Sequence, residues 1–206
     1  MTSCRSWTTA PACDDAGMRR VTYYIILTAD GMYADPDGGL GHYDPAEDEH
    51  RYANDLIRQP TDEFTGRRMY EVMDYWDELD IDAPETPDVE REYAVRYRAT
   101  RKHVISRGDP PLRANAELVQ GDPVEAIRAL KAGDGPDIHI GCGADLLATF
   151  AKADLIDVYR WLVIPTALGS GKHLFGSLHR PLDLRLIGTR TFSSGAVLME
   201  YEPAGR

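Results

Sequence analysis

The chain has 206 residues, of which 43% are hydrophobic, and this length and composition are typical of one α/β domain with a buried core. Its formal net charge of −11 argues against a nucleic-acid partner, because binding phosphates requires clustered basic residues. No run of about 18 apolar residues occurs, which excludes a membrane-spanning helix. Cys4, Cys13 and Cys142 form neither a CxxC pair nor a disulfide framework, so we expect a protein of the reducing cytoplasm.

The first residues differ in character from the rest of the chain. Residues 1–17 have neither the basic start nor the apolar centre of a signal peptide, and they predict a flexible N-terminal tail. A single domain is predicted over residues 18–206. Its first element is a strand at 20–27, which is rich in β-branched and aromatic residues and ends at the turn of residues 30–31.

Strands and helices alternate through the rest of the chain. Asp44 and Pro45 predict the N-cap and first position of a helix that extends to about residue 59, where Pro60 stops it. Asp122 and Pro123 predict a second well-capped helix. The remaining pattern predicts a strand at 62–65, a helix at 69–76, a loop at 79–89, a helical turn at 90–98, strands at 102–106 and 118–119, a strand at 138–140, a helix at 144–153, a strand at 158–164, and a hairpin of strands at 182–189 and 196–201.

Residues 138–146 (Ile-His-Ile-Gly-Cys-Gly-Ala-Asp-Leu) predict a strand that runs into a glycine-rich turn and then a helix. The free N–H groups and the positive dipole at such a helix start favour an anion, and glycines let a pyrophosphate approach the backbone. The alternative is a tight turn that requires positive φ. The run lacks the third glycine of the GxGxxG fingerprint, so by itself it leaves both interpretations open.

Two further polar motifs follow predicted strands. Arg67 and Arg68 stand at the start of a predicted helix, where they oppose the helix dipole unless an anion binds there or carboxylates pair with them. Ser106 and Arg107 follow the next strand and could hold a ribose phosphate or be ordinary loop residues. Because ligands of open α/β sheets bind at the carboxyl ends of the strands, the three motifs together predict a site for an elongated anion such as a dinucleotide with an extra phosphate.

In this order and spacing, the motifs resemble the dihydrofolate-reductase-like superfamily, and more closely the branch related to the C-terminal reductase domain of bacterial riboflavin biosynthesis. Residues 28–34 are similar to that branch's first-strand motif, and residues 168–175 and 189–195 are similar to its C-terminal motifs. The resemblance covers residues 19–202. It implies a three-layer α/β fold with a mostly parallel central sheet and a C-terminal antiparallel hairpin.

The resemblance implies NADPH as the hydride donor, and it implies a homodimer, for which residues 157–164 and the terminal hairpin are the expected interface. Arg67, Arg68 and Met69 would meet the adenosine phosphate and the pyrophosphate, while Ser106 and Arg107 would meet the 2′-phosphate. The remaining residues implied to contact the cofactor are Thr28, Gly141, Cys142, Gly143, Ala144, Asp145, Leu146 and Thr166.

The chain departs from the family pattern at several positions. The superfamily usually has two adjacent glycines, often joined by a cis peptide, where this chain has Gly141 and Cys142; we expect Cys142 to be a small packing residue rather than a nucleophile. Tyr24 stands where the riboflavin-pathway reductases carry a lysine. The acidic run at 47–49 does not align with the carboxylate of true dihydrofolate reductases and is expected on a solvated helix face.

Hydride transfer to a C=N or C=O bond needs an acid or an ordered water at the acceptor. We name Asp30 and Tyr24 as candidate catalytic residues, although Tyr24 could instead face the core. His42 and Tyr43, in a glycine-rich loop able to close as a lid, and Trp76 are predicted to line the substrate pocket, although Trp76 could also be a core residue. No His or Cys pair has metal-ligand spacing, so we predict no metal.

The sequence therefore predicts an NADPH-dependent reductase that transfers a hydride to a C=N or C=O bond of a small metabolite, heterocycles included. An alternative of a different class keeps the fold without the reaction, as a non-catalytic nucleotide-binding scaffold or sensor. Steady oxidation of NADPH with any acceptor would exclude that alternative.

Overall fold

The computed structural model describes residues 19–39, 43–58 and 62–205; the predicted tail and His42 lie outside them. The strands are β1 (Val21–Thr28), β2 (Met32–Ala34), β3 (Asp62–Gly66), β4 (Arg101–Ile105), β5 (Ala116–Leu118), β6 (Ile138–Gly141), β7 (Val158–Ile164), β8 (Lys172–His173), β9 (Leu184–Thr191) and β10 (Val197–Pro203). The helices are α1 (Glu47–Leu56), α2 (Arg67–Met73), α3 (Tyr75–Glu78), α4 (Asp88–Ala99), α5 (Pro123–Lys131), α6 (Ala144–Lys152) and the 3-10 helix η1 (Leu174–Ser177).

Eight strands form one sheet in the order β5-β4-β3-β6-β1-β7-β10-β9, while β2 and β8 pair separately. Every pairing from β5 to β7 is parallel, and β10 runs antiparallel to both β7 and β9. The predicted α/β class, with a mostly parallel sheet and a C-terminal antiparallel hairpin, is confirmed.

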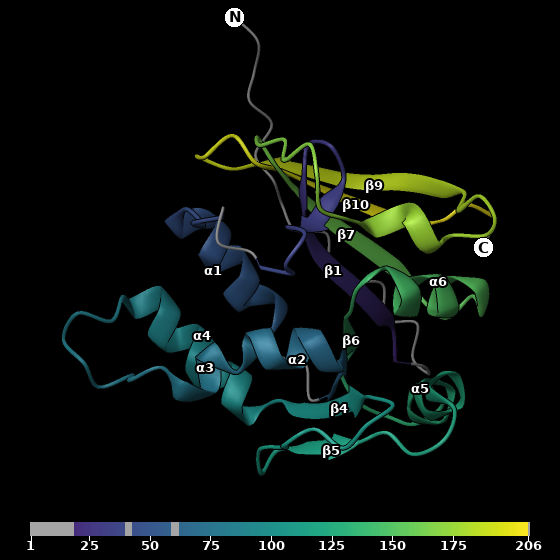
Figure 1. The fold of residues 1–206 in the computed structure, drawn as a ribbon, viewed down its shortest axis with the longest axis horizontal. Coiled ribbons are helices and arrows are strands. Elements are labelled where there is room, and N and C mark those ends of the chain that lie inside the picture. Colours follow the sequence, from purple (N-terminus) through teal and green to yellow (C-terminus); the bar gives the residue numbers. More distant parts are fainter. Residues whose placement is uncertain (1–18, 40–42, 59–61, 206) are drawn as a thin grey trace, which may run out of the picture.

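Helices cover both faces of this sheet, with α1 to α4 on one side and α5 and α6 on the other (Figure 1). Successive side chains of β1 point to opposite faces of the sheet, so they pack alternately against the helices on one face and those on the other. Tyr23 and Ile25 join the main core together with Ile127 of α5 and Phe150 of α6. Tyr24 instead packs against the second, smaller core under α1.

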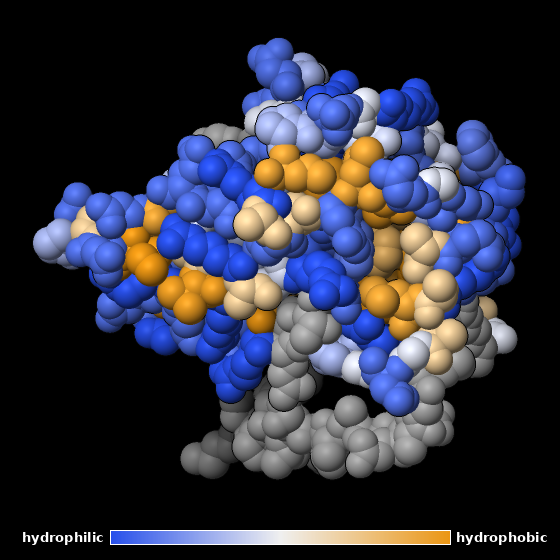
Figure 2. Space-filling model, turned by 90° about the horizontal axis from the view of Figure 1, so that it is seen from below, coloured by the Kyte–Doolittle hydropathy of each residue, from blue (hydrophilic) through white to orange (hydrophobic). Residues whose placement is uncertain are grey.

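Among the described residues, no helix combines the length and the apolar composition needed to cross a bilayer. The molecular face in Figure 2 is largely hydrophilic, with apolar residues gathered in separate patches. Large apolar side chains that remain exposed are Val72, Tyr75, Val95, Leu186 and Ile187.

Two predicted helix starts have different outcomes. Asp122 is confirmed as an N-cap, since its side chain accepts a hydrogen bond from the N–H of Val124 at 2.9 Å. The Asp44 cap is wrong, because α1 begins only at Glu47 and the first intrahelical hydrogen bonds end at the carbonyl of Ala46.

The helix α4 is longer than the predicted helical turn at 90–98, and it begins inside the predicted loop. Its packing on α1 explains the difference. The Asn54 amide donates to the carbonyl of Val89 at 3.0 Å and to Glu92 at 2.9 Å, and Arg96 donates to the carbonyl of Asn54 at 2.6 Å. Tertiary contacts therefore extend a helix whose own sequence pattern is weak.

Candidate active site

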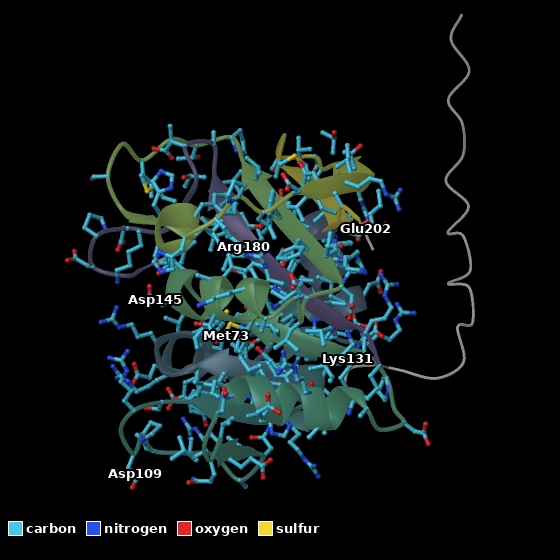
Figure 3. All side chains as sticks on the ribbon, turned by 90° about the vertical axis from the view of Figure 1, so that its right-hand side faces the viewer. Met73, Asp109, Lys131, Asp145, Arg180 and Glu202 are labelled. Carbon is cyan, nitrogen blue, oxygen red and sulfur yellow. The ribbon has the colours of Figure 1, made fainter. Side chains whose placement is uncertain are left out.

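The three motifs that follow strands lie at one edge of the sheet. In the parallel register, Gly66 at the end of β3 is paired with Ile105 of β4, and Thr65 is paired with Gly141 of β6. Figure 3 shows Asp109, after β4, and Asp145, at the start of α6, on the same side of the molecule, whereas Lys131 and Glu202 lie on the opposite side. The arrangement predicted from the motif positions is therefore present.

In the turn after β6, the glycines at 141 and 143 are required because neighbouring side chains leave no room for a Cβ, and not because the backbone has a conformation that only glycine adopts. Neither Gly141 nor Gly143 has positive φ, so the tight-turn alternative is wrong. A Cβ on Gly141 would come within 3.0 Å of Oε1 of Glu63, and one on Gly143 would come within 2.8 Å of the hydroxyl of Tyr33. These glycines keep the backbone open where two polar side chains approach it.

Cys142 is a packing residue, as expected. Its side chain is fully buried in the main core, and burial raises the pKa of its thiol well above the usual value. Its carbonyl accepts a hydrogen bond from the hydroxyl of Tyr23 at 2.9 Å. The described part of the chain has no cis peptide bond, so the turn at Gly141 and Cys142 is trans throughout.

The helix α6 begins directly after this turn without a side-chain cap. Its N-cap residue is Gly143, so the N–H groups of its first turn point to the strand-end edge. Asp145 is exposed and accepts a hydrogen bond from Ser177 at 2.6 Å. Leu146 faces the end of β3, where a Cβ on Gly66 would approach its side chain to 3.0 Å.

The arginines at this edge differ in how they are used. Arg67 forms an ion pair with Glu71 at 2.7 Å, and both side chains are nearly half exposed. For Arg68 and Arg107, both exposed, the described residues provide no ion-pair partner. The hydroxyl of Ser106 accepts a backbone N–H within its own turn. Of the three arginines predicted at this edge, only Arg67 therefore has its charge neutralised by a carboxylate.

Thr28, Asp30 and Thr166 hold two loops together, and none of them lines the cavity described below. The carboxylate of Asp30 accepts hydrogen bonds from the Thr28 hydroxyl at 2.5 Å and from the N–H groups of Leu168 and Gly169 at 3.2 and 2.7 Å. These bonds, led by that from Thr28, lower the pKa of Asp30 to about 2. The carbonyl of Thr166 accepts the N–H of residue 29 at 2.7 Å.

A cavity of about 430 Å³ lies between the sheet and the helices α1 to α4. The predicted residues Tyr24, Tyr43, Trp76, Met69 and Gly141 all line it. The other lining residues are Ile25, Ile26, Tyr33, Pro45, Glu49, His50, Ala53, Leu56, Ile57, Glu63, Val72, Met73, Tyr75, Tyr93, Thr100, His139 and Ile140.

Aromatic rings make one wall of this cavity. The ring centroids of Trp76 and Tyr93 are 4.6 Å apart, and those of Trp76 and Tyr75 are 4.9 Å apart. His50 meets Trp76 and Tyr93 edge-on at 5.5 and 5.7 Å. Its Nδ1 atom is buried, and within the described ranges it has no hydrogen-bond partner. The wall suits a flat ring and leaves one polar atom unsatisfied.

Glu63 of β3, which the sequence analysis missed, provides the free carboxyl group of the cavity. Burial raises its pKa to about 7, although the charge of Lys102 on the neighbouring strand acts in the opposite direction. Among the described residues, no hydrogen bond or ion pair engages this carboxyl group, and the residue is partly exposed to the cavity. One clue was available, because an ionisable residue inside a strand of a sheet covered by helices on both faces is unusual.

The neighbours of Glu63 in the sheet are also polar. Parallel register places Lys102 on one side of it and His139 on the other. The Lys102 amine is buried, donates to the carbonyl of Tyr97 and lies 3.7 Å from the centroid of that ring. Burial, followed by the charge of Arg160, lowers the pKa of His139 to about 4, so this imidazole is neutral near pH 7.

The expectation that the acidic run at 47–49 lies on a solvated face holds for Glu47, whose side chain is 68% exposed, and is wrong for Glu49, which is buried. Asp48 accepts hydrogen bonds from the N–H and the hydroxyl of Ser193 at 2.9 and 2.8 Å. Glu49 is 2% exposed and accepts hydrogen bonds from Tyr43, at 2.5 Å, and from Ser194. The turn of the C-terminal hairpin covers this end of α1, and the carboxylates satisfy the donors of that turn.

Together, the sheet order, the helix layers and the strand-end site define an α/β protein of the dihydrofolate-reductase-like fold. The dihydrofolate reductase of Enterococcus faecalis, solved with NADP(H) and RAB-propyl, superposes with a TM-score of 0.60 at 12% identity, over 91% of this chain and 99% of that one. A putative riboflavin biosynthesis protein from Shewanella sp. PV-4 is similar with a TM-score of 0.68 at 21% identity, over 89% of this chain and 98% of that one.

The chain belongs to the RibD C-terminal domain family, whose sequence model matches residues 19–198. A relative of similar length, the uncharacterised protein YyaP of Bacillus subtilis (strain 168), is 31% identical over 184 residues, which cover 89% of this chain and 94% of the relative. The family resemblance inferred from the motifs is therefore confirmed.

Proposed function

We propose that the protein is an NADPH-dependent reductase that adds a hydride to a C=N or C=O bond of a small molecule held in the aromatic cavity. One observation carries the proposal. Gly141 belongs both to the glycine turn at the strand-end edge and to the lining of the cavity, so the two regions meet at one open backbone position. A cofactor at the edge and an acceptor in the cavity would be neighbours there.

The residues at the edge fit a phosphorylated dinucleotide. The uncapped start of α6 and the side-chain-free backbone at Gly141 and Gly143 suit a pyrophosphate. Arg68 and Arg107 are exposed and available for phosphate oxygens, and charge-assisted hydrogen bonds of this kind are strong. When bound, the reduced nicotinamide supplies the hydride.

The proton for the acceptor would come from Glu63. With a pKa of about 7, its carboxyl group is protonated in a large fraction of molecules near neutral pH, so it can donate to the nitrogen or oxygen that the hydride leaves negative. The low pKa of Asp30 makes it a poor acid, and we assign it the positioning of its loop. Burial raises the pKa of Tyr24 well above its usual value, so its phenol stays protonated and orients the acceptor by donating a hydrogen bond.

The first test is a titration of the protein with NADPH and with NADH, followed by quenching of tryptophan fluorescence, since Trp76 lines the cavity. We expect NADPH to bind more tightly. Changing Arg107 to alanine should weaken NADPH by about 10-fold and NADH much less, because Arg107 is expected at the 2′-phosphate that only NADPH carries. Changing Arg68 to alanine should weaken both nucleotides by about 10-fold, because both carry the pyrophosphate. Arg128→Ala, on the far side of the sheet, is the matched control.

Failure of both nucleotides to bind would refute the reductase. Binding without NADPH oxidation, across a panel of imines and carbonyl compounds, would favour the alternative of a nucleotide-binding scaffold. Steady oxidation with any acceptor would exclude that alternative.

We also propose that the protein forms a homodimer through its C-terminal strands. β9 is the last strand of the sheet, and its Leu186 and Ile187 side chains are 52% and 43% exposed, so apolar side chains lie next to the unpaired backbone of a sheet edge that a second copy could pair with. Sedimentation velocity should give about twice the chain mass, and the double change to Leu186→Lys and Ile187→Lys should yield a monomer. A monomeric native protein would refute this proposal.

A further inference from the structure

The charged groups of the aromatic cavity are strongly one-sided. Its described lining contains two carboxyl residues, Glu49 and Glu63, and neither lysine nor arginine. The buried His139 adds no positive charge near neutral pH, because its pKa is about 4. A phosphate or carboxylate on the bound molecule would find no cation there to replace its water.

The two carboxyl groups are not equivalent. Both oxygens of Glu49 are occupied, one by the hydroxyl of Tyr43 and the other by that of Ser194. Glu63 accepts no hydrogen bond from any group in the described ranges, and it stands beside Gly141, where the cavity meets the strand-end edge. Glu63 is partly exposed and lines the cavity, so its carboxyl group is available to a hydrogen-bond donor on the bound molecule.

The remaining lining sets the shape of that molecule. Trp76, Tyr75 and Tyr93 present rings from α3 and α4, while Ile26 and Tyr24 of β1 face them from the sheet. Flat aromatic molecules stack well on such surfaces. The volume of about 430 Å³ is at the small end for ligand pockets and suits a bicyclic ring without a long substituent.

We infer that the cavity takes an uncharged or cationic planar nitrogen heterocycle, without a phosphate or carboxylate, whose N–H edge donates to the carboxyl group of Glu63. This inference rests on the proposed function in treating the cavity as the acceptor site of the reductase. It selects the acceptor by charge: the only anion-binding groups in the described site lie at the strand-end edge, which the cofactor would occupy.

Three quinolines that differ at one position test the inference by isothermal titration calorimetry without any nucleotide. 2-Aminoquinoline offers a donor edge to Glu63, 2-methylquinoline keeps the ring but lacks the donor, and quinoline-2-carboxylate adds an anion. We expect 2-aminoquinoline to bind about 10-fold more tightly than 2-methylquinoline, and at least about 100-fold more tightly than the carboxylate, from the lost hydrogen bond and the added repulsion.

Glu63→Gln should reduce the advantage of 2-aminoquinoline over 2-methylquinoline to about twofold, while Glu125→Gln on the opposite face of the sheet should leave it unchanged. Glu63→Leu is a second variant that gives the same expectation without a polar group. Circular dichroism spectra of all variants establish that they are folded.

Equal binding of the amine and the carboxylate would overturn the inference, as would a preference for the amine that survives in both Glu63 variants. Absence of binding by all three quinolines would overturn it as well. None of these outcomes depends on NADPH. Failure of the nucleotide titration would therefore refute the proposed function separately from the character of the cavity.

Discussion

The strand-end edge and the aromatic cavity are adjacent but opposite in character. The edge has exposed arginines, an uncapped helix start and glycines that expose the backbone. The cavity has carboxyl groups and aromatic rings, and no lysine or arginine among its described lining. Because a buried charge is tolerated only with a suitable partner, we expect the two regions to select molecules of opposite charge. Gly141 belongs to both, and four changes test how separate they are.

The largest effect is expected from Gly141→Val, since a Cβ there would already approach Glu63 to 3.0 Å. The added methyl groups would block the backbone at the edge and displace the carboxyl group in the cavity. We predict that NADPH and 2-aminoquinoline both bind about 100-fold more weakly, as for other misplacements in tightly packed sites. Gly133→Val is the control, because Gly133 is exposed and a Cβ there would make only an ordinary contact of 3.6 Å, with the carbonyl oxygen of Leu130. Loss of only one ligand would mean that the two regions are independent.

The next largest effect concerns the charge of Glu63. Its native pKa of about 7 is higher than the ordinary value of 4.5, so the folded protein binds more protons than the unfolded chain between these pH values. This contribution to stability is present below about pH 4.5 and is lost as the pH rises through 7. Glu63→Gln should therefore stabilise the protein by about 2 kcal/mol at pH 8 and far less at pH 5.

Urea denaturation of the wild type and of Glu63→Gln at pH 5 and pH 8 measures this difference. A stability gain of the same size at both pH values would show that the carboxyl group is not desolvated. Water would then reach the cavity as freely as it reaches the strand-end edge, and the contrast between the two regions would be lost.

Tyr43→Phe should produce a smaller loss. It removes the hydrogen bond of 2.5 Å to Glu49 and leaves a nearly buried carboxylate oxygen unsatisfied, at an expected cost of about 1 kcal/mol in the free energy of unfolding. Tyr52→Phe is a matched control on the same side of the sheet, because its buried hydroxyl has no partner within the described ranges. If both changes cost the same in urea denaturation, Glu49 is not held in the way described.

Asp30→Asn should have the smallest effect and distinguishes positioning from catalysis. The folded-state pKa of about 2 is below the ordinary 3.8, so the stabilisation by this carboxylate is present above about pH 4 and is lost as the pH falls towards 2. We expect a melting temperature lower by a few degrees at pH 7, no difference at pH 2, and NADPH oxidation within about threefold of the wild type. Loss of oxidation with an unchanged melting temperature would make Asp30 a catalytic residue instead.

The sequence predicted the strand-end edge better than the cavity, for a physical reason. Glycine turns and arginines that follow strands are local patterns, and parallel strands bring their ends to one edge whatever the rest of the chain does. The motifs at Gly141, Arg68 and Arg107 could therefore be placed together before the fold was known. The alternation of β1 likewise left only two possible orientations for Tyr24.

The cavity depends on contacts between distant segments. Burial of Glu49 requires the turn at Ser193 and Ser194, which lies 145 residues further along the chain. Burial of Glu63 requires helices on that face of the sheet, and α4 among them was predicted only as a helical turn. A carboxylate in a charged stretch looks the same in sequence whether or not another element covers it.

The bonds between the loops of residues 29–34 and 166–173 also bear on how the family diversifies. Asp30 accepts two N–H groups from the second loop, Ala29 donates to Thr166, and the short strands β2 and β8 pair. An insertion in one loop would break this set of bonds unless the other loop changed too. Among descendants of a common ancestor, we expect the lengths of the two loops to change together, with recombination breakpoints avoiding any exchange that separates them.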